Sequence, residues 1–204
     1  MGTAKQLLRL GSGTVLEQTL ANLREAALGE IVLVLGSSAD SIRLQLPDSV
    51  LEGVRIVTNE AYEQGMAGSL RVGISAVSTE ADAALVVLAD QPFVRPETFN
   101  RIVEEYSRSH AQIVIPMHGG FRGNPVLLDR SVFHEVMALE GDIGCRAIFE
   151  SHLDGIVKVE VEDPGILLDI DNRDDYERLR HFAPGQVESP ANEEAIGQAG
   201  ETPK

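Results

Sequence analysis

The stretch Ala83-Ala84-Leu85-Val86-Val87-Leu88-Ala89-Asp90-Gln91-Pro92 decides the fold. Its residues up to Ala89 are apolar without alternation, which is typical of a strand buried on both faces of a sheet. The strand is expected to end at Asp90, at the carboxyl edge where ligands bind in open α/β sheets. Asp90 is therefore a candidate metal ligand beside a phosphate, and an Asp before Pro is equally typical of a turn.

Apolar runs and helical patterns alternate along the rest of the chain. Further strands are expected over 31–35, 54–57, 113–115, 125–128 and 156–161, and helices over 14–28, 39–46, 69–77, 97–109, 132–139, 145–152 and 173–181. Thr14 with Glu17 forms a capping box, and a loop over 59–68 precedes Ser69. The alternation predicts an α/β protein, a three-layer α/β/α sandwich around a mostly parallel sheet.

Domain organisation follows from composition. The residues 1–183 can form a single packed domain, the usual outcome for a chain of this length. Beyond Pro184 the composition changes to Gly, Pro, Glu, Gln, Ala and Asn, with few large apolar side chains. Such a segment buries too little apolar surface to order itself, so residues 184–204 are predicted to be a disordered tail.

The charge excludes some partners. The 204 residues carry 17 Lys and Arg against 32 Asp and Glu, a net charge of −15. We expect no generic binding to nucleic acid or to an anionic membrane surface, and a phosphate ligand must be met by local groups. Cys145 is the only cysteine, which excludes an internal disulfide, and neither a signal peptide nor a membrane span is evident, so a cytoplasmic location is predicted.

Carboxylates recur near a second strand end, in Leu168-Asp169-Ile170-Asp171-Asn172. Asp90 together with Asp169 or Asp171 could share Mg²⁺, which binds few protein oxygens and completes its shell with water and phosphate oxygens. Asp169 or Asp171 could instead cap the last helix.

Other candidates are weaker when taken singly. Lys5 precedes a capped helix and could meet phosphate oxygens, although a solvated lysine is common near a terminus. The loop containing Gly65, Gly68 and Ser69 leads to a helix N-terminus, a natural anion site, and loops often carry two glycines without such a role. Arg122 lies in a glycine-rich connection, the five histidines lack metal-ligand spacing, and Cys145 is expected to be a core residue.

In this order, six segments resemble one family. They are Met1 to Leu8, Gly65 to Leu70, Leu88 to Pro92, Arg122 to Val126, Gly141 to Arg146 and Leu168 to Asn172. The chain resembles the MobA-like NTP transferases, and in particular the molybdenum cofactor cytidylyltransferase branch. The resemblance implies a Rossmann-like fold of the nucleotide-diphospho-sugar transferase type.

The resemblance also implies an activity and roles for residues. The activity is transfer of CMP from CTP to molybdopterin with release of pyrophosphate, dependent on Mg²⁺ or Mn²⁺, in service of a xanthine dehydrogenase-family apoenzyme. Lys5 would contact the triphosphate, Asp90 and Asp171 would bind the metal, and the loop with Gly65, Gly68 and Ser69 would bind base and ribose. Arg122, Asn124 and Asp142 would lie on the acceptor side.

Two departures from the family pattern stand out. The family begins with a strand and a glycine-rich turn that leads into Arg-Met-Gly, and this sequence starts at that Met-Gly. The first strand and most of the phosphate loop are therefore missing, either because the start lies upstream or because this version lacks them. Asn124 and Asn172 also stand where this branch would have His and Thr.

Other functions are compatible with the sequence. A GTP-dependent enzyme and a transferase for a sugar or polyol phosphate would use the same motifs. A noncatalytic carrier or maturation chaperone of the molybdenum cofactor is the alternative from another class, and the incomplete phosphate loop favours it.

Overall fold

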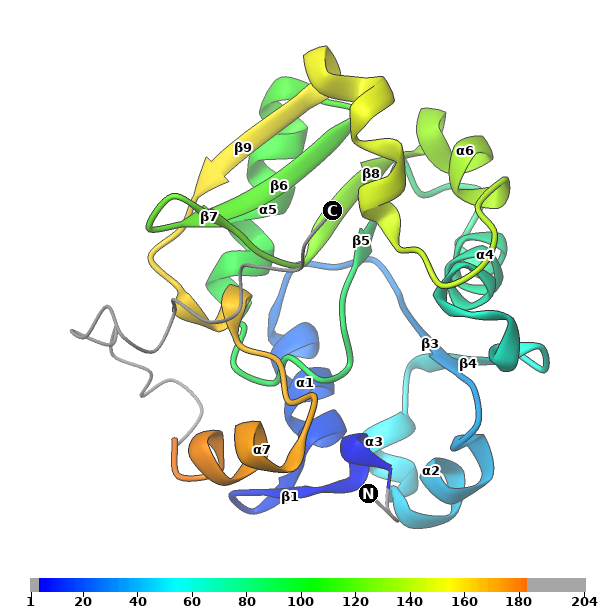
Figure 1. Ribbon diagram of the computed structural model, residues 1–204, viewed down its shortest axis with the longest axis vertical. Helices are drawn as coiled ribbons and strands as arrows, with labels where there is room; N and C mark the ends of the chain where they lie inside the picture. The colour runs from blue at the N-terminus through cyan, green and yellow to red at the C-terminus, as the bar shows by residue number, and fades with distance from the viewer. Residues whose placement is uncertain (1–3, 183–204) are drawn as a thin grey trace.

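Helices cover both faces of the central β-structure in the computed structural model, which describes residues 4–182 (Figure 1). The helices are α1 Val15–Glu25, α2 Ala39–Gln45, α3 Asp48–Leu51, α4 Met66–Ala76, α5 Pro96–Ser109, α6 Phe133–Met137 and α7 Arg173–Leu179. The strands are β1 Arg9–Leu10, β2 Gly13–Thr14, β3 Ile31–Leu35, β4 Val54–Thr58, β5 Ala83–Val86, β6 Ile113–His118, β7 Phe121–Arg122, β8 Val126–Asp129 and β9 Ile156–Glu160. The tail predicted over 184–204 lies outside the described residues.

The predicted Rossmann-like α/β architecture is confirmed, but the strand pairing is mixed rather than mostly parallel. β3 pairs with β4 and β6 with β9 in parallel, whereas β8 is antiparallel to both β5 and β6. The cause is local, because the chain leaves β6, turns through the β6–β7 hairpin and returns as β8. An apolar run has the same pattern in a buried strand of either direction, so the sequence does not reveal this reversal.

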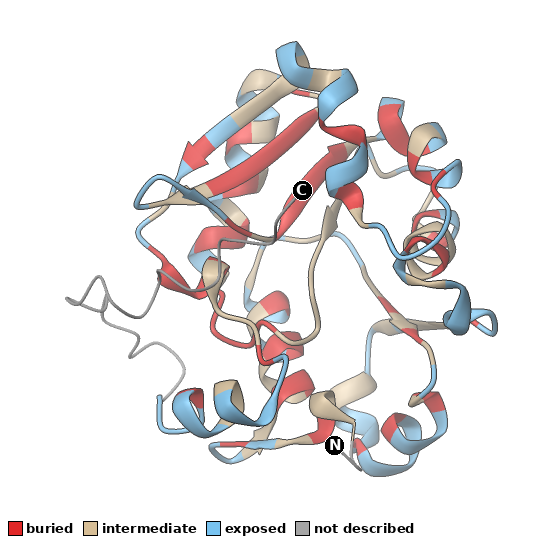
Figure 2. Cartoon of the chain, viewed as in Figure 1, coloured by how far each residue is buried: buried red, intermediate tan, exposed pale blue. Residues whose placement is uncertain are grey.

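The core forms on both faces of the larger sheet (Figure 2). Successive residues of β6 point to opposite sides: Ile113 and Ile115 pack in a cluster with α4 and α6, and Val114 packs in a cluster with α5. α5 has its apolar stripe on the inward side at Phe99 and Ile102, both fully buried. This arrangement gives the layers predicted from the sequence.

Helix signals in the sequence were mostly reliable. The Thr14–Glu17 capping box starts α1, and an Asn172–Asp175 capping box starts α7. The start of α4 was wrong: the helix begins at Met66, so Gly68 and Ser69 lie inside it and Gly65 is its N-cap. Gly65 and Gly68 indicated a loop in the sequence. The helix-compatible residues that follow Gly65 and the packing of α4 against β3 override that tendency.

Three further segments differ from expectation. β5 ends at Val86, so Asp90 lies in a turn beyond the strand. The helix expected over 145–152 is instead a pair of 3₁₀ segments, Cys145–Ile148 and Glu150–Gly155. Leu168 to Ile170, at the second predicted strand end, lie in no strand and follow a 3₁₀ turn over Pro164–Leu167.

The opening apolar run is less buried than its composition predicts. All residues from Ala83 to Asp90 are half-buried rather than buried on both faces. Within residues 4–182, β5 pairs only with β8, and no strand connects it to β3. None of the helices in the described part of the chain is long and apolar enough to cross a bilayer.

Candidate functional site

Lys5 is the centre of the candidate site. Its ammonium Nζ lies 2.5 Å from Oδ2 of Asp90 and 2.8 Å from Oδ1 of Asp171. A short 3₁₀ turn, Lys5–Leu7, supplies the lysine, and the buried side chain of Leu7 fixes this turn to the protein. The backbone bond from the Ile170 N–H to the Asp90 carbonyl, 3.0 Å long, brings the other two segments together. Three sequence-predicted residues therefore meet in one cluster.

The charges in this cluster influence one another. Partial burial opposes ionisation of Lys5, but hydrogen bonds to Asp171 and Asp90 raise its pKa above the ordinary value. The hydrogen bond from Lys5 lowers the pKa of Asp171. Burial, followed by the hydrogen bond and charge of Asp171, raises the pKa of Asp169 to about 6. Asp169 thus belongs to the same cluster, and neither it nor Asp171 caps α7, which is capped by Asn172.

The donor atoms of this cluster suit a hard divalent cation. All are carboxylate oxygens, which Mg²⁺ and Mn²⁺ prefer. Oδ1 of Asp90 is buried and has no hydrogen-bond partner in the described residues, so it is a free acceptor. No group of three potential ligands within 4–182 is already arranged around a metal position, and the Lys5 ammonium lies between the carboxylates instead. The residues fit such an ion once the ammonium moves toward another anion.

The N-terminus of α4 collects Gly65, Met66 and Asp142. The Met66 N–H donates to Oδ1 of Asp142 over 3.2 Å, and the Ala67 N–H donates to the Gly141 carbonyl over 3.1 Å. Gly65 has φ +98°, and a Cβ there would lie 2.5 Å from the Gly141 carbonyl carbon. The Asp142 carboxylate therefore accepts from the first N–H of α4, whose N-cap is Gly65, and glycine is required at position 65 for this close approach.

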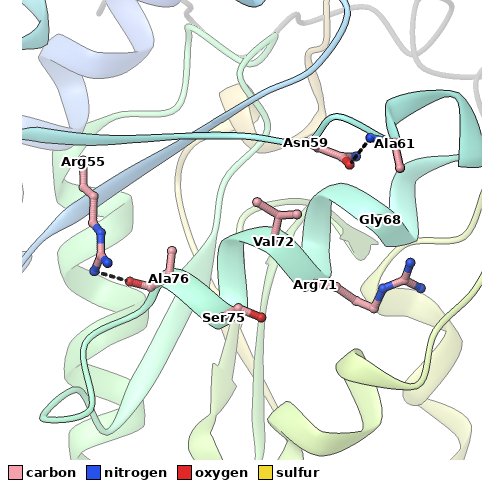
Figure 3. A pocket seen from close by; sticks show the side chains of 8 residues that line it. All are labelled: Arg55, Asn59, Ala61, Gly68, Arg71, Val72, Ser75 and Ala76. Atoms are coloured by element: carbon pink, nitrogen blue, oxygen red, sulfur yellow. Dashed lines mark hydrogen bonds between the residues drawn. The ribbon is translucent and has the colours of Figure 1, made fainter.

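Gly68 lies on the side of α4 that faces Asn59 (Figure 3), and Ser69, the next residue, also contacts Asn59. The buried Asn59 amide donates to the Ser69 hydroxyl over 3.1 Å. This side of α4 borders a pocket of about 450 Å³ that Arg55 and Arg71 also line. Both guanidinium groups donate to backbone carbonyls, of Ala76 and Leu139 respectively. The pocket is built into the fold and is separate from the Lys5 cluster.

Arg122 lies in β7, which pairs with the end of β6, and Asn124 follows two residues later. The Arg122 guanidinium lies 5.2 Å from the centre of the Phe149 ring, and burial together with the Arg146 charge lowers its pKa. The Asn124 N–H donates to the Ile166 carbonyl over 3.1 Å. Within residues 4–182, no hydrogen bond or ion pair joins Arg122, Asn124 or Asp142 to the Lys5 cluster. The predicted residues thus lie in three regions: the Lys5 cluster, α4 with Asp142, and the segment of Arg122 and Asn124.

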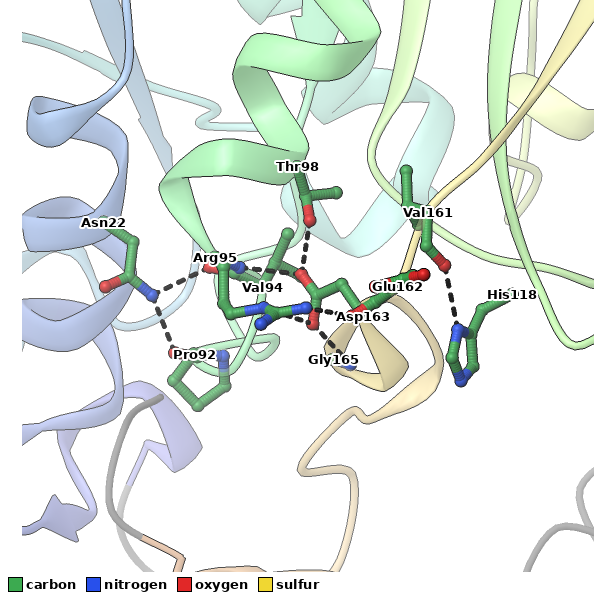
Figure 4. A network of polar contacts seen from close by, with 10 residues as sticks. All are labelled: Asn22, Pro92, Val94, Arg95, Thr98, His118, Val161, Glu162, Asp163 and Gly165. Atoms are coloured by element: carbon green, nitrogen blue, oxygen red, sulfur yellow. Dashed lines mark hydrogen bonds and ion pairs between the residues drawn. The ribbon is translucent and has the colours of Figure 1, made fainter. Parts of the chain in front are cut away.

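Asp163 supports the site, although it was not among the residues predicted from the sequence (Figure 4). This carboxylate is buried and accepts hydrogen bonds from the Arg95 N–H, the Thr98 hydroxyl and the Gly165 N–H. It ties the start of α5 to the segment that leads to Asp169 and Asp171. Nearby, the Asn22 amide donates to the carbonyls of Pro92 and Val94, both at 2.9 Å, and holds the segment that follows Asp90. Its partners Arg95 and Thr98 are distant from it in sequence, so no local pattern reveals this role.

Cys145 is a packing residue, as predicted. It is buried, and desolvation raises the pKa of its thiol to about 11. Its thiol is therefore protonated at neutral pH and a poor nucleophile.

Comparison with known proteins gives consistent matches. The MobA-like NTP transferase domain matches residues 1–156. The chain is similar to the molybdenum cofactor cytidylyltransferase of Escherichia coli, with 25% identity and 86% of each chain covered. It is also similar to the structure of Rv0371c from Mycobacterium tuberculosis in complex with manganese, with 31% identity, 88% and 92% coverage of this chain and that one, and a TM-score of 0.75. A nucleotidyl transferase from Methanothermobacter is 26% identical over 87% of this chain and 84% of its own, with a TM-score of 0.71.

Proposed function

The chain belongs to the MobA-like NTP transferase family, and from this premise we propose that it transfers CMP from CTP to molybdopterin. In this reaction an oxygen of the terminal phosphate of molybdopterin attacks the α-phosphorus of CTP. The bond between the α-phosphorus and the bridging oxygen breaks, and pyrophosphate leaves with the electron pair. The reaction brings two anions together, so it requires charge neutralisation and alignment more than proton transfer.

The Lys5 cluster is the observation that carries this proposal. Lys5, Asp90 and Asp171 come from three distant parts of the chain. Oδ2 of Asp90 and Oδ1 of Asp171 both lie within 2.8 Å of the Lys5 ammonium. Such an arrangement of one cation and neighbouring carboxylates is suited to a triphosphate with its divalent ion. In the absence of these ligands, the ammonium and the carboxylates neutralise one another.

Each residue has a distinct role in the proposal. Asp90, through its free Oδ1, and Asp171 would hold Mg²⁺ or Mn²⁺. A bound divalent ion would offset negative charge on the phosphate oxygens. Lys5 would then turn from the carboxylates to the pyrophosphate, whose charge grows as the bond to the α-phosphorus breaks.

The other predicted residues are proposed to bind the two substrates. Gly65, with Gly68 and Ser69 behind it in α4, would shape the region for base and ribose. Arg122, Asn124 and Asp142 would contribute to the acceptor side, where the Arg122 guanidinium suits a phosphate. Cytidine is proposed because of the name of the Escherichia coli relative and the segment Asp90-Gln91-Pro92. A xanthine dehydrogenase-type apoenzyme in the cytoplasm is the proposed recipient.

A transfer assay tests the function. The protein is incubated with molybdopterin, Mg²⁺ or Mn²⁺, and CTP or GTP labelled at the α-phosphate, and labelled dinucleotide and pyrophosphate are quantified. We expect label transfer from CTP that stops on addition of EDTA. Transfer from GTP alone would replace the cytidylyl assignment by a guanylyl one. Tight molybdopterin binding with neither nucleotide bound would contradict the enzyme and indicate a carrier.

A further inference from the structure

Residues 141–155, the 141–155 segment, lie between α6 and β9 and form no regular α-helix (Figure 1). At the start of the segment, the Gly141 carbonyl and the Asp142 carboxylate accept hydrogen bonds from the first N–H groups of α4. The rest of the segment is built from two 3₁₀ turns. Such turns have poorer hydrogen-bond geometry than an α-helix, so the place of the segment depends on its contacts with other elements.

His152 connects the end of this segment to two of those elements. Its Nε2 lies 2.6 Å from Oε1 of Glu135 in α6, and its Nδ1 lies 3.0 Å from Oε1 of Gln112, the residue before β6. The second oxygen of Glu135 accepts from the Ser151 hydroxyl over 3.3 Å. The His152 side chain is only 11% exposed, so water competes little for its two nitrogens.

Both ring nitrogens of His152 face oxygen atoms, and this arrangement favours one charge state of the ring. A neutral imidazole has one N–H donor and one bare nitrogen, whereas the imidazolium has two donors. Only the imidazolium can therefore donate to Glu135 and Gln112 at the same time. Loss of a proton places a lone pair against one of these oxygens, and that hydrogen bond breaks.

Glu135 is the charged group that faces His152 directly. His134, on the same helix, comes within 3.9 Å of the same Glu135 oxygen but is 77% exposed, so solvent screens its charge. The hydrogen bond from His152 lowers the pKa of Glu135, which keeps this carboxylate ionised over the range in which histidine titrates. The remaining charged residues of the two 3₁₀ turns are exposed: Arg146, Glu150 and Asp154.

We propose that His152 is a positioning residue, which holds the 141–155 segment in place while its ring is charged and releases it as the pH rises. A histidine side chain changes its charge between about pH 5 and 8. The charged form exists at the lower end of this range, so the segment is held there and loosens toward the upper end.

Hydrogen bonds inside the turns connect His152 to the start of the segment. The His152 N–H donates to the Phe149 carbonyl over 3.1 Å, and the Phe149 N–H donates to the Arg146 carbonyl over 3.2 Å. The Ala147 N–H donates to the Gly144 carbonyl over 3.1 Å. Loosening at His152 therefore reaches the residues that contact the N-terminus of α4.

The proposed function gives this release a consequence, and this step alone rests on the proposed function. Asp142 is proposed to lie on the acceptor side of the site. The chemical step would take place at the Lys5 cluster, which is built from other segments. Release of the 141–155 segment should therefore raise the KM for molybdopterin and leave kcat unchanged.

The first experiment observes the protonation of His152. The chain is labelled with ¹⁵N in its five histidines, and the ring signals are recorded from pH 5 to pH 9. The His152 signals are those that disappear in His152→Gln. We expect both ring nitrogens to carry a proton at pH 6 and one of them to lose it toward pH 8. A ring that is already neutral at pH 6 would overturn the proposal.

The second experiment measures amide hydrogen exchange, corrected for the pH dependence of the exchange chemistry. Protection of the Phe149 and His152 amides should fall roughly tenfold between pH 6 and pH 8.5, the effect of losing one hydrogen bond to a charged group. The amides of β4, which pairs with β3, are the internal control and should keep their protection. Equal protection of the Phe149 and His152 amides at both pH values would overturn the proposal.

Matched variants separate positioning by the charged ring from ordinary packing. Glu135→Gln keeps the size of the side chain and removes its charge, so protection should be low already at pH 6 and change little up to pH 8.5. Gly155→Ala should act in the same way, because the new Cβ would overlap with Oε1 of Gln112 and displace it from His152. Gly29→Ala, which has open space around it, should keep the wild-type profile. A wild-type profile in Glu135→Gln would overturn the proposal.

The transfer assay tests the consequence for the acceptor. The KM for molybdopterin in Glu135→Gln should exceed that of the wild type roughly tenfold at pH 6 and equal it at pH 8.5, with kcat unchanged at both values. Equal KM values at pH 6 would overturn the link to the acceptor side. The ring signals and the amide exchange need no nucleotide transfer, so they test the positioning role even if the proposed activity fails.

Discussion

The ammonium of Lys5 lies 2.5 Å from Oδ2 of Asp90 and 2.8 Å from Oδ1 of Asp171. The lysine thus compensates two carboxylates that would otherwise repel each other and any incoming phosphate. This pairing gives Lys5 a part in the ligand-free protein as well as in the proposed reaction.

Replacing Lys5 by alanine should lower the rate of CMP transfer by about 10²- to 10³-fold, because a positive charge that stabilises the leaving pyrophosphate is lost. Arginine at this position keeps the charge and should retain part of the rate. Lys158, exposed on β9 and remote from the cluster, provides the control Lys158→Ala, which should transfer CMP normally. Steady-state rates with CTP measure the effect, and full activity of Lys5→Ala would contradict the role.

Gly65→Ala should destabilise the protein by roughly 3 kcal/mol. The new Cβ would clash with the Gly141 backbone, and alanine would have to adopt the φ of +98° that Gly65 has. Gly11→Ala is the matched control: Gly11 has φ +58° and free space around it, so only the conformational cost of about 1–2 kcal/mol applies. Urea unfolding of both variants gives the comparison. Equal losses would mean that the contact with Gly141 is not tight.

Asp163→Asn should lower the free energy of unfolding by about 2–4 kcal/mol. The reason is that the charge is lost from a buried carboxylate that accepts hydrogen bonds from three donors. Its neighbour Glu162 is exposed, and Glu162→Gln should change stability little. Thermal and urea unfolding test the pair. An Asp163→Asn variant with the stability of the wild type would show that Asp163 does not support the site.

Asp129 should make stability depend on pH. Burial opposes its ionisation, but hydrogen bonds from Ser131 and Tyr106 hold its pKa below the usual value. A lowered pKa in the folded state means that the stabilisation is present above the ordinary value of 3.8 and is lost as the pH falls through the folded pKa. The stability difference between wild type and Asp129→Asn should therefore be larger at pH 7 than at pH 3.

In urea titrations at both pH values, a constant difference would show that the charge of Asp129 contributes nothing. Phe at position 106 is the companion test, because it removes the hydroxyl that donates to Asp129 over 2.6 Å. Tyr106→Phe should reproduce part of the pH-dependent loss.

The sequence predicted the helices with strong caps and the approximate positions of most strands. Thr14 and Asn172 predict the starts of α1 and α7, because their side chains accept hydrogen bonds from N–H groups only three residues away. The antiparallel direction of β8 follows from the β6–β7 hairpin, and an apolar run has the same pattern in either direction. The helical position of Gly68 depends on the packing of α4 against β3, which no local pattern encodes. These features became evident only in the folded chain.

The candidate site was predicted to a similar degree. Lys5, Asp90 and Asp171 were selected from their order in the chain and from a family resemblance, and the structure brings their charged groups together. Asp163 was missed because its partners, Arg95 and Thr98, are distant in sequence. Asp142, assigned to the acceptor side, makes a contact that could not be foreseen, at the N-terminus of α4.

The Lys5 cluster also has a practical consequence for solution work. The sequence contains only three lysines, Lys5, Lys158 and Lys204, so amine-directed labelling with isotopic acetyl groups gives very few signals to assign. Of the two lysines within residues 4–182, Lys5 is the amine held by two carboxylates, and its labelling rate depends on how tightly they retain it. The labelling rate of the Lys5 Nζ atom can therefore report when a ligand draws the ammonium away from the carboxylates, without any assay of the substrate.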